Sequence, residues 1–180
     1  MADLELTDNQ KRNIISRVRN TLRQELGMEV LQTEYDIPDL RVGLFVTLIK
    51  GGQLRGCIGT FLEQPLDQNL QSMACAAAFN DHRFPVLKRD EFDELRIEVT
   101  LMSSAFPIKA EDVEVGRHGL IITMGHHKGV LLPQVAVDHR WDRSAFIEHT
   151  CIKAGLPAQA YTQSNCCIEA FEAVIVGEEN

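Results

Sequence analysis

The strongest constraint on the fold is a pair of glycines, Gly51 and Gly52, between two apolar runs. "RVGLFVTLIK" precedes the pair and "QLRGCIGTF" follows it. Adjacent glycines adopt the positive φ of a tight hairpin turn at little cost, so this stretch predicts two antiparallel strands. Two further apolar runs flank "GHHKG" at residues 125–129 and predict a second hairpin. Because a hairpin joins antiparallel neighbours, a purely parallel sheet is excluded.

Helical patterns are interspersed with these hairpins. Residues 6–27 place apolar side chains at helical spacing, with the capping-box pattern "TDNQ" near the start and a glycine at the end. The alanine-rich residues 65–81 predict a second helix, with a proline suited to its first turn. Residues 141–156 predict a third helix, which Asp142 can cap.

Two more stretches have the pattern of strands. Residues 94–104 alternate apolar and polar side chains, and residues 166–176 form an apolar run near the end of the chain. Hairpins and helices in this mixed order predict an α+β fold with a mainly antiparallel sheet flanked by helices.

The length of 180 residues fits a single domain, residues 1–180. The stretch at about residues 103–135 is expected to form a small subdomain.

Composition restricts the partners. The chain carries 26 acidic and 18 basic residues, a formal net charge of −8. Nucleic acids and anionic membranes bind to basic faces, so both are disfavoured, although a local basic pocket is compatible with this charge. The longest apolar run, "VGLFVTLI", is far shorter than the ~20 residues of a membrane-spanning helix. The acidic start "MADLELTDNQ" lacks the apolar stretch of a signal peptide.

The five cysteines indicate a reducing compartment. Their number is odd and none forms a CxxC pair, while the adjacent Cys166 and Cys167 point to opposite faces of a strand and are poor disulfide partners. We therefore expect a cytoplasmic protein. Cys75 and Cys151 lie on apolar helix faces and are expected to fill the core.

The stretch "LRGCIG" places a thiol between glycines and close to a fixed positive charge. In a regular strand, Arg55, Cys57 and Gly59 share one face, and Arg55 can fold back toward the sulfur. At ~6 Å, two unit charges interact by about 2.8 kcal/mol at an effective dielectric constant of 20, which would favour the thiolate. Gly56 and Gly59 would let a ligand or another backbone approach closely. The alternative is that the glycines mark a bulge or tight packing around a buried cysteine.

Three further residues are candidates for the same site. Asp81 and Arg83, in "FNDHRFP" at a helix end, can line a pocket or form a local ion pair. Glu98, on a neighbouring strand, is a candidate proton acceptor. His126 and His127 have no carboxylate or cysteine at ligand spacing, so no metal site is expected there. Trp141 is expected to anchor packing.

Several ordered blocks of the sequence resemble the AMMECR-type domain, known in bacteria and archaea as protein A of the AmmeMemoRadiSam system. "LRGCIG" at residues 54–59 is similar to the hallmark motif of that family. "AAAFNDHRFPVL", "RIEVTLM", "HGLIITMGHHKGVLLPQVAVDHRWD" and "FIEHTCIKAGL" resemble its other blocks. The resemblance covers residues 10–176. It departs at His82, where the family usually has proline, and at Tyr161, where it has tryptophan.

The resemblance implies a two-part α+β architecture, with a larger part formed by about residues 1–102 and 136–180 and a smaller part, about residues 103–135, inserted between them. The hallmark motif is expected near the groove where the two parts meet. It also implies a MEMO-type protein and a radical S-adenosylmethionine enzyme as partners, but it names no reaction. Two hypotheses follow. In one, the cleft around "LRGCIG" binds a small anionic ligand or a partner segment, in an accessory role; in the other, Cys57 is an activated thiolate of an enzyme or group carrier, with Arg55 and Glu98 in supporting roles. No cofactor is expected, and either a monomer or a homodimer is compatible with the sequence.

Overall fold

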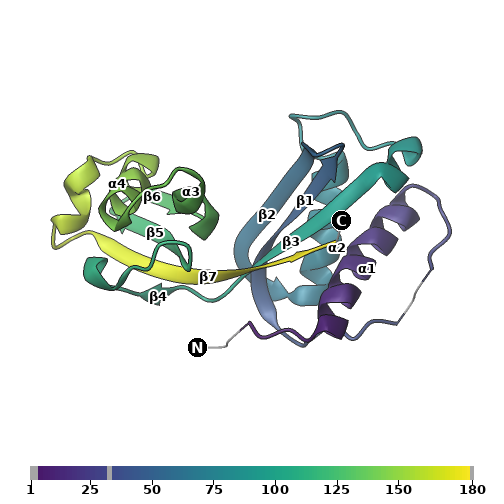
Figure 1. Ribbon diagram of the computed structural model, residues 1–180, viewed down its shortest axis with the longest axis horizontal. Helices are drawn as coiled ribbons and strands as arrows, with labels where there is room; N and C mark the ends of the chain where they lie inside the picture. The colour runs from purple at the N-terminus through teal and green to yellow at the C-terminus, as the bar shows by residue number, and fades with distance from the viewer. Residues whose placement is uncertain (1–3, 32–33, 179–180) are drawn as a thin grey trace. The chain divides into compact units, whose positions relative to one another are not determined.

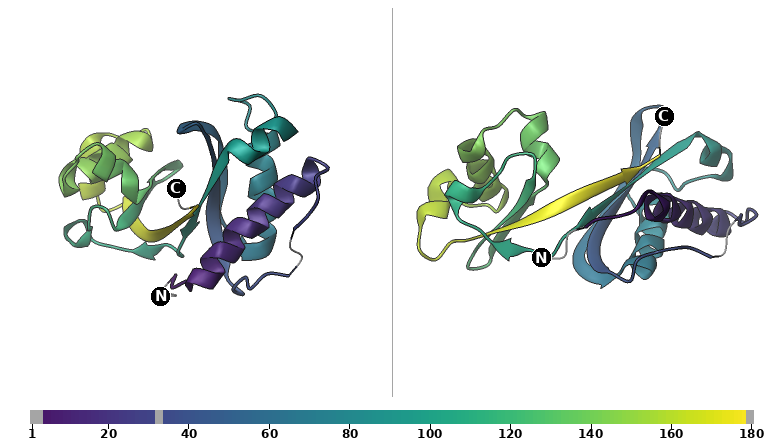
Figure 2. Two further views of the ribbon diagram at one scale, coloured as in Figure 1. Left: turned by 45° about the vertical axis from the view of Figure 1, so that its right-hand side comes forward. Right: turned by 60° about the horizontal axis from the view of Figure 1, so that its bottom comes forward.

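The computed structural model describes residues 4–31 and 34–178. The chain folds into two compact units (Figures 1 and 2). Of the described residues, the larger unit contains 4–31, 34–102 and 174–178, and the smaller unit is Ser103–Ala173. The smaller unit begins where the sequence analysis placed it but continues well beyond residue 135. The physical reason is that the helix and strand after residue 135 pack with the hairpin before it.

The larger unit is a sheet with two long helices on one face (Figure 1). Strand β1 is paired with β2 on one side and with β3 on the other, both antiparallel, and the end of β7 follows β3. The elements are α1 (Asp8–Glu25), β1 (Arg41–Lys50), β2 (Gln53–Pro65), α2 (Leu66–Phe79), a 3₁₀ helix (Arg89–Glu94), β3 (Leu95–Met102) and the last residues of β7 (Cys167–Gly177).

The first helix and the first hairpin form as the sequence predicts. Thr7 caps α1 by accepting a hydrogen bond from the backbone N–H of Gln10, and the Gln10 side chain accepts one from the Thr7 N–H. Gly51 and Gly52 have φ of 56° and 74°, which explains why two glycines make the turn between β1 and β2.

The core of the larger unit lies between the sheet and the helices. Alternate residues of β1 and β3 are fully buried there and meet the apolar faces of α1 and α2. The other face of the sheet carries the intervening residues, which are half-buried or more polar. The buried set from the two strands is Leu44, Val46, Leu48, Ile97, Val99 and Leu101.

The smaller unit has its own core. Its strand β7 pairs antiparallel with β5 and β4, and β5 also pairs with β6, so the hairpin predicted around "GHHKG" is present. The elements are β4 (Phe106–Pro107), a 3₁₀ helix (Ala110–Asp112), β5 (His118–Met124), β6 (His127–Leu131), α3 (Pro133–Asp138), α4 (Arg143–Lys153), a 3₁₀ helix (Ala158–Thr162) and most of β7.

Local signals decide two details of this unit. Asp142 caps α4 through the N–H of Ala145, as its position predicts. The strand expected after "GHHKG" ends earlier than the apolar run suggests, because Pro133 begins the short helix α3. Trp141 packs against the core and is stacked between the rings of His139 and His149.

The fold is therefore α+β with an antiparallel sheet in each unit, as the sequence predicts. Within the part of the chain that the structure describes, no helix combines the length and the apolar character needed to cross a membrane.

Gly56 is predicted to be essential for packing α2 on the sheet. A Cβ at this position would lie 2.2 Å from the carbonyl oxygen of Ala77, which belongs to the helix backbone. Gly56→Ala should therefore lower the free energy of unfolding by about 3 kcal/mol, because the helix must move away. Gly177→Ala is the control, since its Cβ would meet the flexible Glu98 side chain at 3.3 Å and the nearest backbone atom, the carbonyl oxygen of Ile97, at 4.0 Å. Equal urea midpoints for the two variants would contradict this packing role.

Candidate functional site

The candidate site is built around Cys57 on β2. Its partner across the hairpin is Thr47 of β1, and the Thr47 Oγ1 lies 3.3 Å from the Cys57 Sγ. Thr47 is in turn the partner of Glu98 on β3. The three side chains form a row across three strands, on the face of the sheet away from the helices. Cys57 is half-buried there, so the thiol is neither sealed in the core nor fully exposed.

A β-bulge decides that the sulfur points to this face. Leu48 is opposite Gly56 and Ile49 is opposite Leu54, which leaves Arg55 without a partner in the register. A regular two-residue hairpin would have placed Cys57 opposite Val46, whose side chain is fully buried under the helices. The extra residue shifts the register by one position, so that Gly56 faces α2 and Cys57 faces the other way.

The bulged Arg55 is held by Glu91 of the 3₁₀ helix. Its Nε donates to Glu91 Oε1 at 3.0 Å, and its Nη2 donates to Oε2 at 2.9 Å. Both side chains are largely buried, with 11% and 17% exposed. The sequence analysis expected the guanidinium to fold back toward the sulfur. The period-2 alternation behind that expectation does not continue through a bulge, and the guanidinium instead forms this two-bond ion pair.

The Glu91 carboxylate has two further partners besides Arg55, the Lys50 side chain and a backbone N–H. Lys50 Nζ lies 3.4 Å from its Oε1, and the backbone N–H of Lys88 donates to its Oε2 at 3.1 Å. These contacts, the hydrogen bonds from Arg55 above all, lower the pKa of Glu91 from its ordinary value to about 2. The carboxylate therefore stays charged at any physiological pH and fixes the bulge.

The outer edge of β2 is closed at Cys57 by two side chains. Among the described strands β2 pairs with β1 alone, so backbone groups on its other side need partners from elsewhere. The Cys57 N–H donates to Asp81 Oδ2 at 2.9 Å, and the Cys57 carbonyl oxygen accepts from Arg83 Nη2 at 3.1 Å. We call this pair of residues the Asp81–Arg83 clamp. It supplies the two hydrogen bonds that a neighbouring strand would make.

The clamp is itself a strong ion pair. Arg83 Nε donates to Asp81 Oδ1 at 2.9 Å, and Nη2 donates to Oδ2 at 2.8 Å. These bonds and the N–H of Cys57 hold the pKa of Asp81 well below its usual range. The pKa of Arg83 is raised, mainly by its hydrogen bonds to Asp81, with a smaller contribution from the charge of Cys57. The Asp81 side chain is 3% exposed and that of Arg83 is 58% exposed, so the clamp presents its cation to solvent.

The two glycines of the motif leave no open space for a ligand. The position of a Cβ on Gly56 is occupied by the carbonyl of Ala77, and on Gly59 by the ring of Phe45 at 2.3 Å. The sequence analysis allowed either a ligand or another backbone to fill such space. At Gly56 it is another backbone, and at Gly59 it is an aromatic ring, which itself contacts Phe61 edge to face.

Glu98 lies farther from the sulfur than a direct proton acceptor would. Thr47 stands between Glu98 and Cys57, so their backbones are separated by two strand spacings, about 10 Å. Glu98 forms an ion pair of 3.7 Å with Arg96 on the same strand.

Two residues of the site escaped the sequence analysis. Thr47 becomes visible only when the shifted register of the hairpin is known. Glu91 lies in "RDEFDE", an acidic stretch in which nothing distinguishes one carboxylate from another. Within residues 4–31 and 34–178, no three side chains among His, Cys, Asp and Glu are grouped in a way that could hold a metal ion.

These features define an α+β protein with a half-buried thiol beside a clamped arginine at a sheet edge. The chain belongs to the AMMECR1 family, whose model matches residues 6–176. It is 36% identical over 187 residues to a protein of Methanothermobacter thermautotrophicus, covering 97% of each chain. It is 38% identical to protein LS215_2104 of Saccharolobus islandicus, covering 97% of this chain and 84% of the relative. The crystal structure of the uncharacterized protein PH0010 from Pyrococcus horikoshii matches with a TM-score of 0.76 at 31% identity, covering 97% and 93% of the two chains.

The Arg55–Glu91 pair predicts a specific loss of stability in acid. The Glu91 carboxyl has a lower pKa in the folded state than in the unfolded chain, so its ionised form stabilises the fold at pH values above the ordinary pKa of 4.5. This stabilisation is lost as the pH falls toward about 2. Glu91→Gln should lower the free energy of unfolding by about 2 kcal/mol at pH 7 and flatten its decline between pH 4.5 and pH 2. Urea unfolding at several pH values measures both effects.

Glu94→Gln is the matched control. Glu94 also lies 3.4 Å from Lys50, but its side chain is 62% exposed, so the substitution should change stability by less than about 0.5 kcal/mol. Equal losses in the two variants would show that Glu91 does not anchor the bulge.

Proposed function

We propose that the surface around Cys57 binds a small anionic ligand or an anionic segment of a partner protein. In this proposal the chain is an accessory protein in the cytoplasm, acting with a radical S-adenosylmethionine enzyme and a MEMO-type protein. The observation that carries the proposal is the exposed guanidinium of Arg83, held rigidly beside the thiol by a buried carboxylate.

The hydrogen bonding of the Arg83 guanidinium supports the proposal of an anionic ligand. Its Nε and Nη2 are engaged with Asp81 and with the carbonyl of Cys57, whereas its Nη1 has no hydrogen-bond partner among the described residues. A carboxylate or phosphate oxygen is the acceptor that such a donor prefers. Arg55 is less suited to this role, because its Nε and Nη2 already donate to Glu91 and the side chain is largely buried.

Similarity at the level of the family supports the accessory role. The motif blocks in the sequence resemble a component that accompanies two other proteins, and the family model covers almost the whole chain. An accessory protein needs a recognition surface rather than a complete set of catalytic groups. The clamp provides such a surface, while Glu98, the one proton acceptor that we considered, is separated from Cys57 by Thr47.

The alternative function is that of an enzyme or group carrier that uses the Cys57 thiolate. One contact favours it: the Thr47 hydroxyl lies 3.3 Å from the sulfur and can donate a hydrogen bond to a thiolate. The Arg83 guanidinium is bonded to the carbonyl oxygen of the same residue, Cys57. In this function the thiol carries the substrate, and Arg83 positions it.

Binding of an anion is predicted to depend on Arg83. Titration with pyrophosphate should shift the side-chain Nε–H signal of Arg83 in NMR spectra, and Arg83→Ala should weaken binding about tenfold, a loss of about 1.4 kcal/mol. Arg96→Ala is the control, because Arg96 is a half-buried arginine of the same sheet with a loose contact of 3.7 Å to Glu98. Unchanged binding by the Arg83 variant would refute the role of the clamp.

Replacement of the thiol separates the two functions. If the surface only binds, Cys57→Ser should co-purify with the MEMO-type and radical S-adenosylmethionine proteins of the same genome as well as the wild type does, whereas Arg83→Ala should not. If the thiol is chemically active, Cys57 should react with iodoacetamide faster than the exposed Cys167. Loss of function in Cys57→Ser alone would favour the enzyme or carrier.

A further inference from the structure

The end of β7 leaves an open strand edge in the larger unit. The N–H of Glu178 donates to the carbonyl oxygen of Ile97 at 3.2 Å, so the backbone groups of Glu178 point toward β3. Backbone groups of alternate residues point to opposite sides of a strand. The N–H and C=O groups of Ile175 and Gly177 therefore point away from β3. Because the pairing of β7 with β5 ends at Glu172, no described strand pairs with them on that side.

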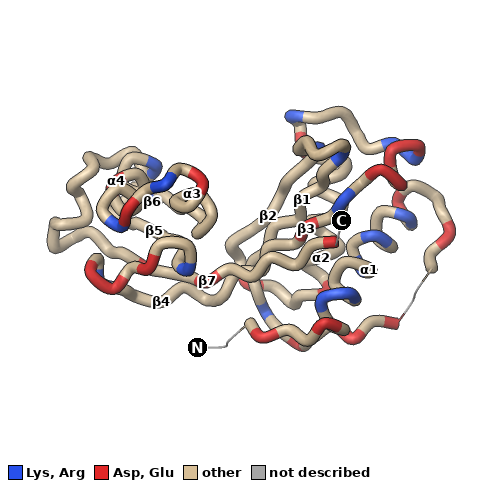
Figure 3. Tube along the Cα trace, in the orientation of Figure 1, with Lys and Arg blue, Asp and Glu red and all other residues tan. Residues whose placement is uncertain are grey.

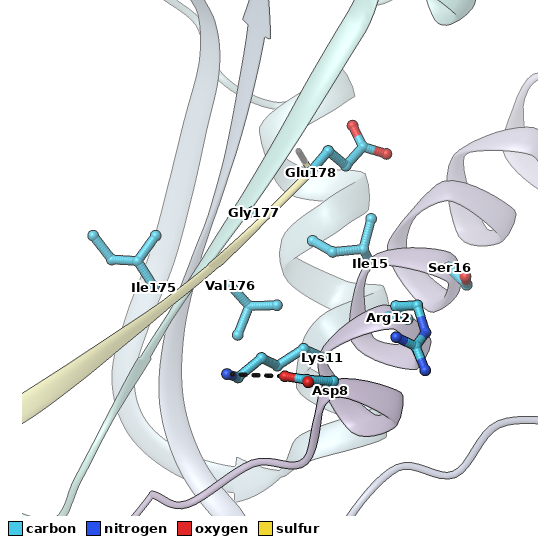
Figure 4. Close-up of a pocket in the computed structure, with 9 residues that line it drawn as sticks. All are labelled: Asp8, Lys11, Arg12, Ile15, Ser16, Ile175, Val176, Gly177 and Glu178. Atoms are coloured by element: carbon cyan, nitrogen blue, oxygen red, sulfur yellow. Dashed lines mark ion pairs between the residues drawn. The ribbon is translucent and has the colours of Figure 1, made fainter. Parts of the chain in front are cut away.

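A groove runs between this edge and helix α1 (Figure 4). Its cavity volume is about 620 Å³. The helix contributes one face, with residues at the helical spacing of three and four, and the strand contributes its last residues. Ile15 and Val176 form the apolar floor and are almost fully buried. The lining residues are Asp8, Lys11, Arg12, Ile15, Ser16, Ile175, Val176, Gly177 and Glu178.

The available charge along the groove is positive. Glu178 is neutralised by Arg19, whose Nη2 donates to it at 2.8 Å, and it also accepts from the N–H of Ile97. Lys11 extends from α1 toward β7 (Figure 4) and has only a loose contact of 3.6 Å with the exposed Asp8. Arg12, on the same helix turn, has no ion pair among the described residues. Figure 3 shows further basic residues along α1.

We propose that this groove binds an extended, acidic segment of a partner protein, which adds as a strand to the open edge of β7. The segment would form main-chain hydrogen bonds with Ile175 and Gly177. One of its apolar side chains would pack on Ile15 and Val176, and a carboxylate would pair with Lys11 or Arg12. This surface is at the opposite edge of the sheet from β2, so it is independent of the site at Cys57.

The pattern of open backbone groups favours a peptide over a small molecule. Two residues at positions i and i+2 present donor and acceptor pairs about 6.6 Å apart, which is the repeat of a second strand. A strand edge next to a helix is also an established geometry for binding extended peptides by strand addition. The basic residues of α1 select acidic segments, and the apolar floor selects one aliphatic side chain.

The test is a selection of random decapeptides displayed on phage against the whole chain, followed by NMR mapping. Selected peptides should carry Asp or Glu and an aliphatic residue, and should protect the amides of Ile175 and Gly177 from hydrogen exchange. Ile175→Pro removes one outward N–H without disturbing the pairing with β3, and proline is tolerated on a strand edge. This variant should bind at least tenfold more weakly, whereas Ile175→Val, which keeps the N–H, should bind like the wild type.

A second variant tests the proposal independently of whether the proline variant folds. The double variant Lys11→Glu/Arg12→Glu changes two residues in the first turns of α1. Acidic residues are favoured there by the helix dipole, so the fold should be retained. Binding should fall at least tenfold, and added salt should no longer weaken it, because the substitution replaces attraction to the acidic peptide by repulsion. The proposal is overturned if no peptide binds more tightly than about 1 mM. Binders that map elsewhere, or that bind equally to both variants, overturn it as well.

Discussion

The ion pair between Arg55 and Glu91 is the contact on which the candidate site depends. It holds the extra residue of β2 next to the hairpin turn, and this residue sets the register from Gly56 to Thr60. With the bulge in place, Gly56 meets the backbone of α2 and Cys57 meets Thr47 on the other face. Without it, the sulfur would enter the core and a glycine would occupy the open face. The arginine of the motif thus acts on the cysteine through the backbone rather than through its charge.

The outward backbone groups at the two edges of the sheet in the larger unit are satisfied differently. At β2, the Asp81–Arg83 clamp satisfies the outward backbone groups of Cys57 and leaves a cation exposed. At the end of β7, two residues keep their outward groups open beside an apolar floor and a basic helix. An edge that is closed by fixed side chains suits recognition of a small group or a side chain. An edge that is open suits recognition of a backbone.

The glycines of the motif illustrate why one pattern can support two interpretations. Missing side chains beside a cysteine are compatible with access for a ligand and with close packing. At Gly56 and Gly59 the space is filled by the chain itself, because a helix carbonyl and an aromatic ring approach within contact distance. The charged groups next to Cys57 on this surface therefore come from the clamp, whose two residues lie 24 and 26 positions after Cys57 in the sequence.

The sequence by itself determined the elements whose causes are local. Paired glycines made the hairpin, a capping box began α1, Asp142 began α4, and alternating apolar residues gave the antiparallel sheet. The sequence also brought together Cys57, Asp81 and Arg83 as candidates. Tertiary structure alone decided the bulge at Arg55, the partnership with Glu91 and the extent of the smaller unit. Each of these depends on contacts between residues distant in the chain, and a shift of one residue in register leaves no trace in local spacing.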